Sequence, residues 1–337
     1  PKTGFIIQRL KEELDGGDVL FKGFIPTTWM YMLNRAKLFE ISNPFLFKVI
    51  EQITSGRDQL KKWTKKPYSQ KLFINPTVAE SLVYIFRTLR NVLAKIIRRI
   101  TFRSNRWGVA YQYITDWRDA TLWKSKMIPN PANRYLADPF IMYRNGKHYC
   151  FVEDFSYKNR TGSISVYEID QGNYKELGKV LEEKFHLSFP FIFEFNNEIY
   201  MCPETHKSKD IRIYKCIDFP MKWNLEKILF SEVDAADTTI FYKNEKWWLM
   251  TNMSSSKLGE HMSELHIFYS DNPLSTNWKP HTLNPVIFDP EYARNGGLII
   301  EDDKIFRVHQ RQGFDSYGKG LGISEIKFIN EDQYEES

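Results

Sequence analysis

The chain has 337 residues and a net charge of +5, and 15% of its residues are aromatic. With 42% hydrophobic and 26% charged residues, this composition excludes a disordered chain and is typical of a globular protein of one or two domains. No run of about 18 apolar residues occurs, so the sequence predicts no membrane-spanning helix.

Residues 1–56 are predicted to be mixed helix and loop. A turn at Asp15, Gly16 and Gly17 precedes the apolar strand DVLFKGFI, and the periodic stretch MYMLNRAKLFEISNPFLFKVIEQI predicts a helix that is broken at Pro44. The stretch LKEELDGGDVLFKGFIP resembles the last part of a formyltransferase-type catalytic domain. This resemblance implies that residues 1–56 are the tail of such a domain, whose cofactor and catalytic motifs would lie upstream. The alternative is a separate helical cap.

Residues 57–106 form a basic segment, with 13 Lys and Arg against two acids. From Leu82 to Ile100 apolar residues recur at three- and four-residue spacing with basic residues between them, which predicts a basic amphipathic linker helix. Two interpretations stay open: the apolar face docks on a neighbouring domain, or residues 82–106 lie on an anionic membrane surface. No base-reading motif accompanies the segment, so we expect no nucleic-acid partner.

From residue 107 onward short aromatic and β-branched runs alternate with turn residues, which is typical of an all-β fold. Four stretches that begin at Pro139, Pro190, Thr238 and Gly296 align without gaps, at spacings of 51, 48 and 58 residues. Such periods are typical of propeller blades with four strands. A fifth blade would combine WGVAYQYI near Trp107 with GLGISEIKFI near the C-terminus. We therefore predict a mainly β fold, a five-bladed β-propeller over residues 107–330, preceded by a small helical or mixed N-terminal region.

Polar residues recur at matched positions of these four stretches. Directly before each stretch lie Asp138, Phe189, Asp237 and Asn295, and fourteen positions into it lie Glu153, Glu204, Asn252 and Gln310. Because the inner strands of a propeller line a central funnel, we expect carboxylates from several blades to converge there. Paired carboxylates serve as acid and base in glycosidic-bond chemistry, so Asp138, Asp237 and Glu204 are our candidate catalytic groups. The alternative is that these acids cap turns.

Other polar side chains cluster at the same strand ends. Arg294 stands beside glycines in ARNGG, where a guanidinium fork would suit a carboxylate or a phosphate. Our candidate substrate-binding residues are Glu153, His186, Arg294, His309 and Gln310. The sequence indicates no metal site and does not identify a cofactor.

The three cysteines, Cys150, Cys202 and Cys216, lack the paired spacing of a zinc site. We expect them to be reduced core residues, which favours a cytoplasmic protein, and we expect the sequons at Asn159 and Asn252 to be chance matches. The chain opens with neither a signal peptide nor an initiating methionine, so we interpret it as a fragment of a longer protein.

The motifs YLADPF, HLSFPFIFEFNNEIYMCPET, DAADTTIF and ARNGG resemble the N-terminal five-bladed propeller of the glucosamine inositolphosphorylceramide transferase family, from Trp107 to about Ile329. This resemblance, with the formyltransferase-like tail, implies the bacterial arrangement of that propeller. More distantly, the ADP at Ala137–Pro139 is similar to a motif of the arabinanase and xylosidase glycoside hydrolases. That similarity implies that Asp138 is a general base. Phe189 and Asp237 depart from the acids that those hydrolases have in their second and third blades, which argues against ordinary hydrolysis.

These features together predict a propeller that binds or processes a sugar or glycan, either free or linked to a lipid. Its setting would be a cytoplasmic, transferase-associated protein of cell-surface glycan or glycolipid biosynthesis, in peripheral contact with a membrane. Two alternatives stay open. One is a glycoside hydrolase with Asp138 as base and Asp237 or Glu204 as acid. The other is a noncatalytic scaffold for an upstream formyltransferase-like enzyme domain.

Overall fold

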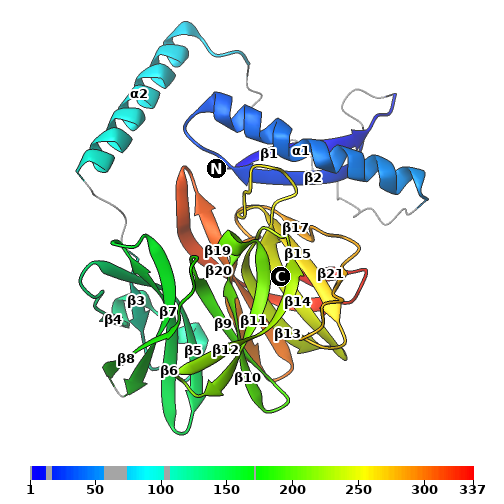
Figure 1. The fold of residues 1–337 in the computed structure, drawn as a ribbon. Helices are drawn as coiled ribbons and strands as arrows, with labels where there is room; N and C mark the ends of the chain where they lie inside the picture. The colour runs from blue at the N-terminus through cyan, green and yellow to red at the C-terminus, as the bar shows by residue number, and fades with distance from the viewer. Residues whose placement is uncertain (1, 13–16, 57–73, 102–106, 171) are drawn as a thin grey trace. The chain divides into compact units, whose positions relative to one another are not determined.

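A computed structural model describes residues 2–12, 17–56, 74–101, 107–170 and 172–337. The chain forms two compact units (Figure 1). The first comprises Pro1–Asn105, Ser255–Leu258 and Gln312–Tyr317, and the second comprises Arg106–Ser254, Gly259–Arg311 and Gly318–Ser337. None of the described helices combines the length and the apolar character that crossing a membrane requires.

The first unit begins with a β-hairpin covered by a helix. Strands β1 (Lys2–Arg9) and β2 (Asp18–Pro26) pair antiparallel, and helix α1 (Tyr31–Thr54) contacts both. Phe45 of α1 stacks on Phe21 of β2, with ring centroids 4.7 Å apart. The strand predicted at DVLFKGFI is confirmed as β2. Strand β1 replaces the helix or loop that we expected there, and of the predicted turn Asp15 and Gly16 lie outside the described residues.

Helix α1 continues through Pro44, so the break predicted there is wrong. A proline inside a helix lacks the N–H that bonds four residues back, and it costs about 3 kcal/mol. The helix buries Ile41, Phe45 and Val49 on one face, and each buried side chain of this size contributes about 1.5–3 kcal/mol. Packing on the hairpin therefore outweighs the local effect of the proline.

The predicted amphipathic helix is confirmed as α2 (Val78–Ile100). Its first turn is closed by a reciprocal pair of bonds between Thr77 and Glu80. The Glu80 carboxylate accepts from the Thr77 main-chain N–H at 2.8 Å, and the Thr77 hydroxyl accepts from the Glu80 N–H at 3.3 Å. This capping box supplies partners to N–H groups that a helix leaves unpaired at its start. Residues 102–106 of the predicted segment lie outside the described residues.

The second unit is a propeller of four blades, each an antiparallel sheet whose strands follow one another in the sequence. The blades are numbered first to fourth along the chain. The first has strands β5 (Arg134–Arg144), β6 (Lys147–Ser156), β7 (Thr161–Asp170) and β8 (Asn173–Leu181). The second has β9 (Ser188–Phe195), β10 (Glu198–Glu204), β11 (Asp210–Asp218) and β12 (Lys222–Ser231).

The third blade has β13 (Ala235–Lys243), β14 (Lys246–Met253), β15 (Glu264–Ser270), β16 (Lys279–Pro280) and β17 (Ile287–Phe288). The fourth has β18 (Asn295–Glu301), β19 (Lys304–Gly313), β20 (Ser316–Ile329) and β21 (Tyr334–Glu336). The four hairpins aligned in the sequence are the first two strands of each blade. The mainly β propeller class is thus confirmed.

The predicted fifth blade is wrong in its composition, because the two chain segments assigned to it do not pair. The stretch GLGISEIKFI belongs to β20 of the fourth blade. Near Trp107 the chain forms β3 (Val109–Tyr111), which pairs only with β4 (Lys126–Ile128) among the described residues. At its C-terminal end β20 pairs with β21, from Ile326 to Ile329, and β3 pairs with β4 instead.

The β3–β4 hairpin and the turns that follow β3 contact the first and the fourth blades. Val109 and Ile128 are buried with Leu136 and Val152 of the first blade. Trp117 packs on Phe306 of the fourth blade, with ring centroids 5.1 Å apart, and Arg118 forms a salt bridge of 2.7 Å with Glu301. The segment that contains this small hairpin therefore connects the fourth blade to the first.

Aromatic and β-branched residues fill the space between neighbouring blades, as expected from a composition rich in both. The three cysteines are free and buried, which confirms the prediction that they are reduced core residues. Burial raises the pKa of the Cys150 thiol to about 12, so this thiol is inert at neutral pH.

Candidate active site

Three inner strands carry a β-bulge at the same level. The register skips two residues after Ala137 in β5, after Ser188 in β9 and after Ala236 in β13. The first residue in each bulge has a left-handed main chain, with φ of 47° at Asp138, 47° at Phe189 and 50° at Asp237. A bulge redirects the side chain that it carries.

The second set of matched residues lies directly across from these bulges. Glu153 pairs with Ala137, Glu204 with Ser188 and Asn252 with Ala236. The main chain of Gln310 donates to Arg294 O at 2.8 Å at the equivalent place in the fourth blade. Both sets of matched residues therefore lie at the same end of the four hairpins. Their spacing in the sequence alone could not show this.

Arg294 joins acids from two blades. Its Nε donates to Asp237 Oδ2 at 2.6 Å, and its Nη2 lies 3.6 Å from Glu204 Oε2. The main-chain N–H of Asp237 also donates to Glu204 Oε2, at 3.3 Å. Asp237 is only 2% exposed, so this ion pair is almost completely removed from water. The structure thus brings together three of the predicted site residues.

Asp138 interacts with the same group through its charge. Burial and the negative charge of Asp237 raise the pKa of Asp138 to about 6, against the opposite effects of Arg294 and of a hydrogen bond from the Phe189 main chain. Burial, and then the charge of Asp138, raise the pKa of Glu153 to about 8. Charges act on one another in this way over short distances inside a protein, and Glu153 lies on β6 directly across from the bulge that carries Asp138. Asp138 and Glu153 therefore belong to one cluster with Glu204, Asp237 and Arg294, which we call the acid cluster.

The environment of the acid cluster disfavours the ionised form of Glu204. Burial and the charge of Asp237 raise the pKa of Glu204 well above its usual value, although Arg294 acts in the opposite direction. Carboxyl groups that share one buried site cannot all ionise. At neutral pH Glu153, with a pKa of about 8, is thus mostly a neutral acid, whereas Asp138, with a pKa of about 6, is mostly ionised.

His186 and Tyr135 surround the carboxyl group of Glu153. The Tyr135 hydroxyl donates to Glu153 Oε1 at 3.2 Å, and His186 Nε2 lies 3.5 Å from the same oxygen. His186 Nδ1 accepts from the Gly162 N–H at 2.8 Å, which leaves the proton of the neutral ring on Nε2, facing Glu153. Burial lowers the pKa of His186 to about 4, so the ring stays neutral. His186 was predicted as a site residue, and Tyr135 was not.

Aromatic rings continue from this point along the first blade. Tyr135 stacks on Phe155 with ring centroids 4.8 Å apart, and Tyr157 and His186 each contact Phe155 edge-on. All four side chains are partly exposed. Tyr135 lies two residues before the strand partner of Glu153, and Phe155 lies two residues after Glu153. This spacing of two residues is the one signal in the sequence that could have identified Tyr135 as a site residue. Side chains of this kind can stack on the apolar face of a sugar ring.

His206, two residues after Glu204 in the sequence, also lies beside Glu204 in the structure. Its Nδ1 lies 3.5 Å from Glu204 Oε1, and burial and the nearby His261 lower its pKa. His261 Nε2 in turn lies 2.9 Å from Asp234 Oδ1. Neither His261 nor Asp234 was identified in the sequence, because both come from loops that the repeat alignment does not cover.

His309 and Gln310 take different places. His309 is 1% exposed, lies with its Nε2 3.5 Å from Ser324 Oγ, and packs on Tyr292 within and beside the fourth blade. The charges that act on it come from Arg307, Glu336 and Arg311 rather than from the acid cluster. Gln310 adjoins Arg294 through its main chain. Contact of these two residues with a substrate stays a prediction.

No group of three or more His, Cys, Asp and Glu side chains among the described residues is arranged to hold a metal ion. The acid cluster offers the chemistry of carboxylic acids whose pKa values differ. A neutral acid and a carboxylate in one buried site can give and take protons from a bound hydroxyl or glycosidic oxygen.

Residues 103–337 match the family described as glucosamine inositolphosphorylceramide transferase 1, N-terminal. The chain is 36% identical over 211 residues to glucosamine inositolphosphorylceramide transferase 1 of Arabidopsis thaliana and 34% identical over 211 residues to the protein of that name from Oryza sativa subsp. japonica. Each alignment covers 61% of this chain. The chain spans only 27% and 28% of the length of these two relatives.

Among solved structures the chain is similar to an α-L-arabinanase of Cellvibrio cellulosa complexed with arabinohexaose. The sequence identity is 14%, the TM-score is 0.46, and the match covers 60% of this chain and 77% of the arabinanase. The family match extends over most of the chain and includes the four blades and all five residues of the acid cluster. The chain therefore belongs to the glucosamine inositolphosphorylceramide transferase family, in the part described as the N-terminal region.

Proposed function

We propose that the propeller binds a sugar at the acid cluster and processes it within a transferase-associated protein of cell-surface glycan or glycolipid biosynthesis. The observation that carries this proposal is the convergence of four acids from three blades with an arginine that directly precedes the fourth blade: Asp138, Glu153, Glu204, Asp237 and Arg294. The two plant relatives are named glucosamine inositolphosphorylceramide transferase 1, and these names support the same class of function.

The protonation states suit transfer of a glycosyl group. Asp138, with a pKa of about 6, is mostly ionised at neutral pH and would accept the proton of an acceptor hydroxyl. Glu204, whose pKa is raised well above its usual value, would donate a proton to the departing oxygen. Asp237 is held by Arg294 in an ion pair, so we assign it the role of positioning rather than of proton transfer.

The partly exposed rings beside Glu153 support a sugar as the bound molecule. Tyr135 and Phe155 would offer a flat apolar surface, and the Tyr135 hydroxyl, Glu153 and His186 would offer hydrogen bonds at its edge. Sugar sites commonly combine a few placed polar groups with aromatic lining.

A glycoside hydrolase is the second candidate, with Asp138 as general base and Glu204 as acid. An ionised Asp138 beside a Glu204 whose pKa is raised well above its usual value favours a hydrolase as much as it favours a transferase. The third candidate, a noncatalytic scaffold for a formyltransferase-like domain, is supported by the ion pair between Asp237 and Arg294. Against it, Asp138 and Glu153 form no ion pair with Lys or Arg among the residues that the structure describes.

We further propose a cytoplasmic location, which the three free, buried cysteines support. A lipid-linked sugar as substrate would bring the protein to a membrane surface, and the basic amphipathic helix α2 supplies a face that suits such a surface. The tail of a formyltransferase-like domain in residues 1–56 also stays a proposal.

Calorimetric titration with neutral, amino and acidic sugars, free and nucleotide-linked, tests the sugar site. The wild type, Asp138→Asn and the control Asp303→Asn, at an exposed turn of the fourth blade, would be compared, with product analysis of each mixture. Binding that weakens only in Asp138→Asn supports the site. Release of a free sugar that the mutation abolishes would favour the hydrolase, and failure of every sugar to bind would overturn the proposal.

A further inference from the structure

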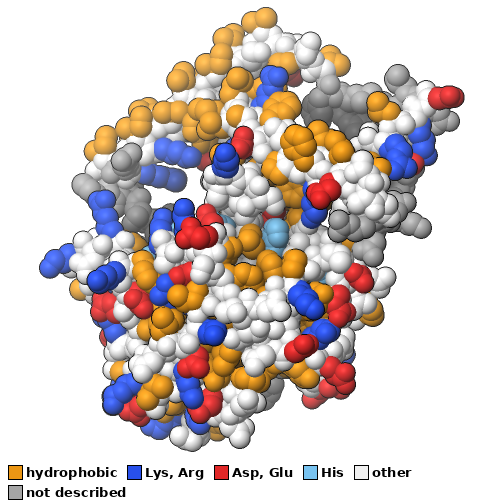
Figure 2. Space-filling view, turned by 45° about the vertical axis from the view of Figure 1, so that its right-hand side comes forward, with side chains coloured by type: hydrophobic (Ala, Val, Ile, Leu, Met, Phe, Trp, Pro, Cys, Tyr) orange, Lys and Arg blue, Asp and Glu red, His pale blue; other side chains and the backbone are white. Residues whose placement is uncertain are grey.

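The apolar side chains of α2 gather on one side of the helix. At about 100° per residue, eight of them fall within an arc of about 120°. They are Leu82, Ile85, Phe86, Leu89, Leu93, Ile96, Ile97 and Ile100, and each is between 48% and 69% exposed. We call this set the α2 apolar face, and Figure 2 shows hydrophobic side chains along one side of the helix. Soluble monomers rarely expose an apolar surface of this extent.

The charged residues on the rest of the helix are basic from Ser81 onward. Arg87, Arg90, Lys95 and Arg98 are exposed outside the arc of the α2 apolar face. The one acid of the helix, Glu80, lies in the first turn, where it is bonded to Thr77. From Ser81 to Ile100 the helix therefore carries positive charge without any compensating acid of its own.

Neighbours within the first unit touch α2 from the polar side. The main-chain N–H of Tyr31 donates to the Tyr84 hydroxyl at 3.0 Å, and the Lys95 ammonium lies 5.1 Å from the centre of the Trp29 ring. On a helical projection Tyr84 and Lys95 lie well away from the α2 apolar face. Both contacts are therefore made from the side of the helix opposite the α2 apolar face.

We propose that α2 docks on an anionic phospholipid surface, with its apolar face among the acyl chains and its arginines at the headgroups. Charge decides between two candidate partners of the α2 apolar face, a second copy of the helix and an anionic lipid surface. A second copy of the helix would bring the same positive charge against itself, whereas an anionic bilayer attracts each exposed Lys and Arg. A helix with an apolar face, a cationic face and few acids is the pattern that lies flat in a membrane interface. This contact specifies the membrane association proposed above for α2, and its test does not depend on the sugar site.

Co-sedimentation with vesicles tests the docking. Vesicles of phosphatidylcholine alone and of phosphatidylcholine mixed with phosphatidylserine would be compared for the full chain. We expect binding to the mixed vesicles only, and weaker binding as salt rises, because salt screens the attraction. Equal binding to both kinds of vesicle, or binding to neither, would overturn the proposal.

Paired variants locate the contact on α2. Arg87→Gln with Arg98→Gln should weaken binding to the mixed vesicles roughly 30-fold, since each basic residue near an anionic surface contributes roughly fivefold. The matched control, Lys175→Gln with Lys227→Gln, removes the same charge from exposed positions of the propeller and should leave binding unchanged. An equal loss in the control would show a net-charge effect and contradict the proposal.

Leu89→Ser with Leu93→Ser tests the apolar part of the contact. Both residues are exposed, so the change should leave the propeller folded, and circular dichroism and the sugar titration serve as independent checks. We expect binding to the vesicles to be lost. If the wild type instead forms a dimer without lipid and this variant is a monomer, the α2 apolar face joins two copies of the chain and the membrane proposal fails.

Discussion

The guanidinium of Arg294 donates to the carboxylate of Asp237 across 2.6 Å, and this bond joins the third blade to the start of the fourth. Asp237 is 2% exposed, and the side chain of Arg294 is 13% exposed. Because a charge buried without a partner is strongly unfavourable, each group makes the position of the other tolerable. The same ion pair thus stabilises the contact between two blades and positions two residues of the acid cluster.

Arg294→Gln leaves Asp237 buried without its cation. We expect the free energy of unfolding to fall by about 3–5 kcal/mol at neutral pH, as for other broken buried pairs. Denaturant unfolding measures this loss. The double variant Arg294→Gln with Asp237→Asn removes both charges and should regain most of the stability. A single variant as stable as the wild type would contradict a structural role for the pair.

Glu153→Gln should alter how stability depends on pH. Burial raises the pKa of Glu153 to about 8 in the folded protein, whereas a Glu in an unfolded chain has a pKa of about 4.3. The unfolded chain therefore loses this proton first, so the stability that the group contributes is complete below about pH 4.3 and is lost as the pH rises to about 8. Replacement by Gln should remove a decline on the order of a few kcal/mol over that range.

Denaturation midpoints at several pH values between these limits would measure the change in Glu153→Gln. Glu194→Gln, at an exposed position of β9, is the matched control and should keep the wild-type profile. If the profile of Glu153→Gln also matches that of the wild type, Glu153 is not buried as a neutral acid.

Gly322→Ala tests the packing around His309. A Cβ at Gly322 would lie 2.3 Å from the His309 ring, and His309 is itself buried. We expect a loss of about 1–3 kcal/mol in unfolding free energy, the usual effect of overpacking. Gly320→Ala, two residues earlier in the same strand, would place its Cβ in open space and should change little. Equal effects at both positions would show that the loss comes from strand propensity and not from contact with His309.

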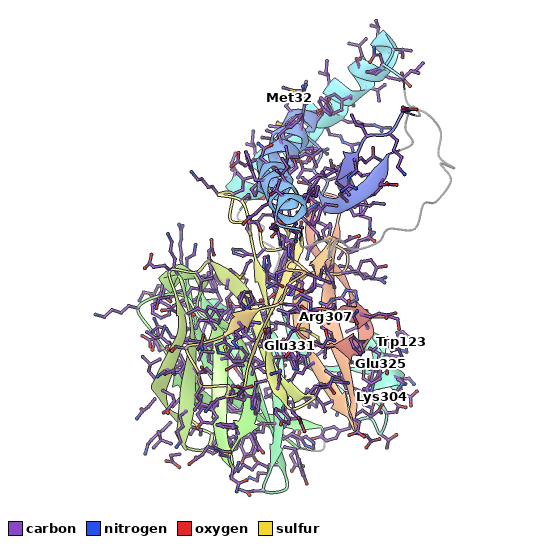
Figure 3. All side chains as sticks on the ribbon, turned by 90° about the vertical axis from the view of Figure 1, so that its right-hand side faces the viewer. Met32, Trp123, Lys304, Arg307, Glu325 and Glu331 are labelled. Carbon is purple, nitrogen blue, oxygen red and sulfur yellow. The ribbon has the colours of Figure 1, made fainter. Side chains whose placement is uncertain are left out.

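Glu336→Gln probes a second buried pair. Arg307, with no exposed surface, donates to Glu336 through Nε at 2.8 Å and through Nη2 at 2.6 Å, and Figure 3 shows it among the strands of the fourth blade. We expect the variant to lose about 3–5 kcal/mol, measured by denaturant unfolding. The neighbouring Glu335 is exposed, so Glu335→Gln should stay within about 0.5 kcal/mol of the wild type.

The pH dependence of this pair has the opposite sign to that of Glu153. The charge of Arg307 lowers the pKa of Glu336 despite its burial, so the pair stabilises the fold above the ordinary pKa of a Glu. That stability is lost as the pH falls through the folded pKa. The difference between the wild type and Glu336→Gln should therefore shrink in acid, and a difference that stays constant would contradict the ion pair.

The hairpins could be predicted because they repeat. Each inner pair of strands is joined by a two-residue turn, at Asn145–Gly146, Asn196–Asn197, Asn244–Glu245 and 302–303, and the alternation of apolar residues sets the rest. The partner of β20 could not be predicted in this way. An apolar strand fits several sheet edges equally well in sequence, and only the register of the turns before and after it decides which edge it joins.

The acid cluster was predictable in its members and not in its contacts. The repeat alignment identifies its four acids, which occupy the two sets of matched positions: Asp138 and Asp237 in one, Glu153 and Glu204 in the other. Their convergence, however, depends on left-handed main-chain conformations at non-glycine residues. Such conformations are unfavourable by about 1–2 kcal/mol and leave no clear mark in a single sequence. Tyr135 escaped attention for a related reason, because its contact with Glu153 crosses two strands of the first blade.

The two ends of each inner strand differ in what they can tolerate. In the first blade the turn at Asn145 lies seven residues from Asp138, which is about 23 Å along an extended strand. A peptide tag or a fluorescent label inserted into such a turn would leave the carboxylates where they are. The propeller could thus be attached, labelled or joined to another protein from this end while the opposite end keeps its chemistry.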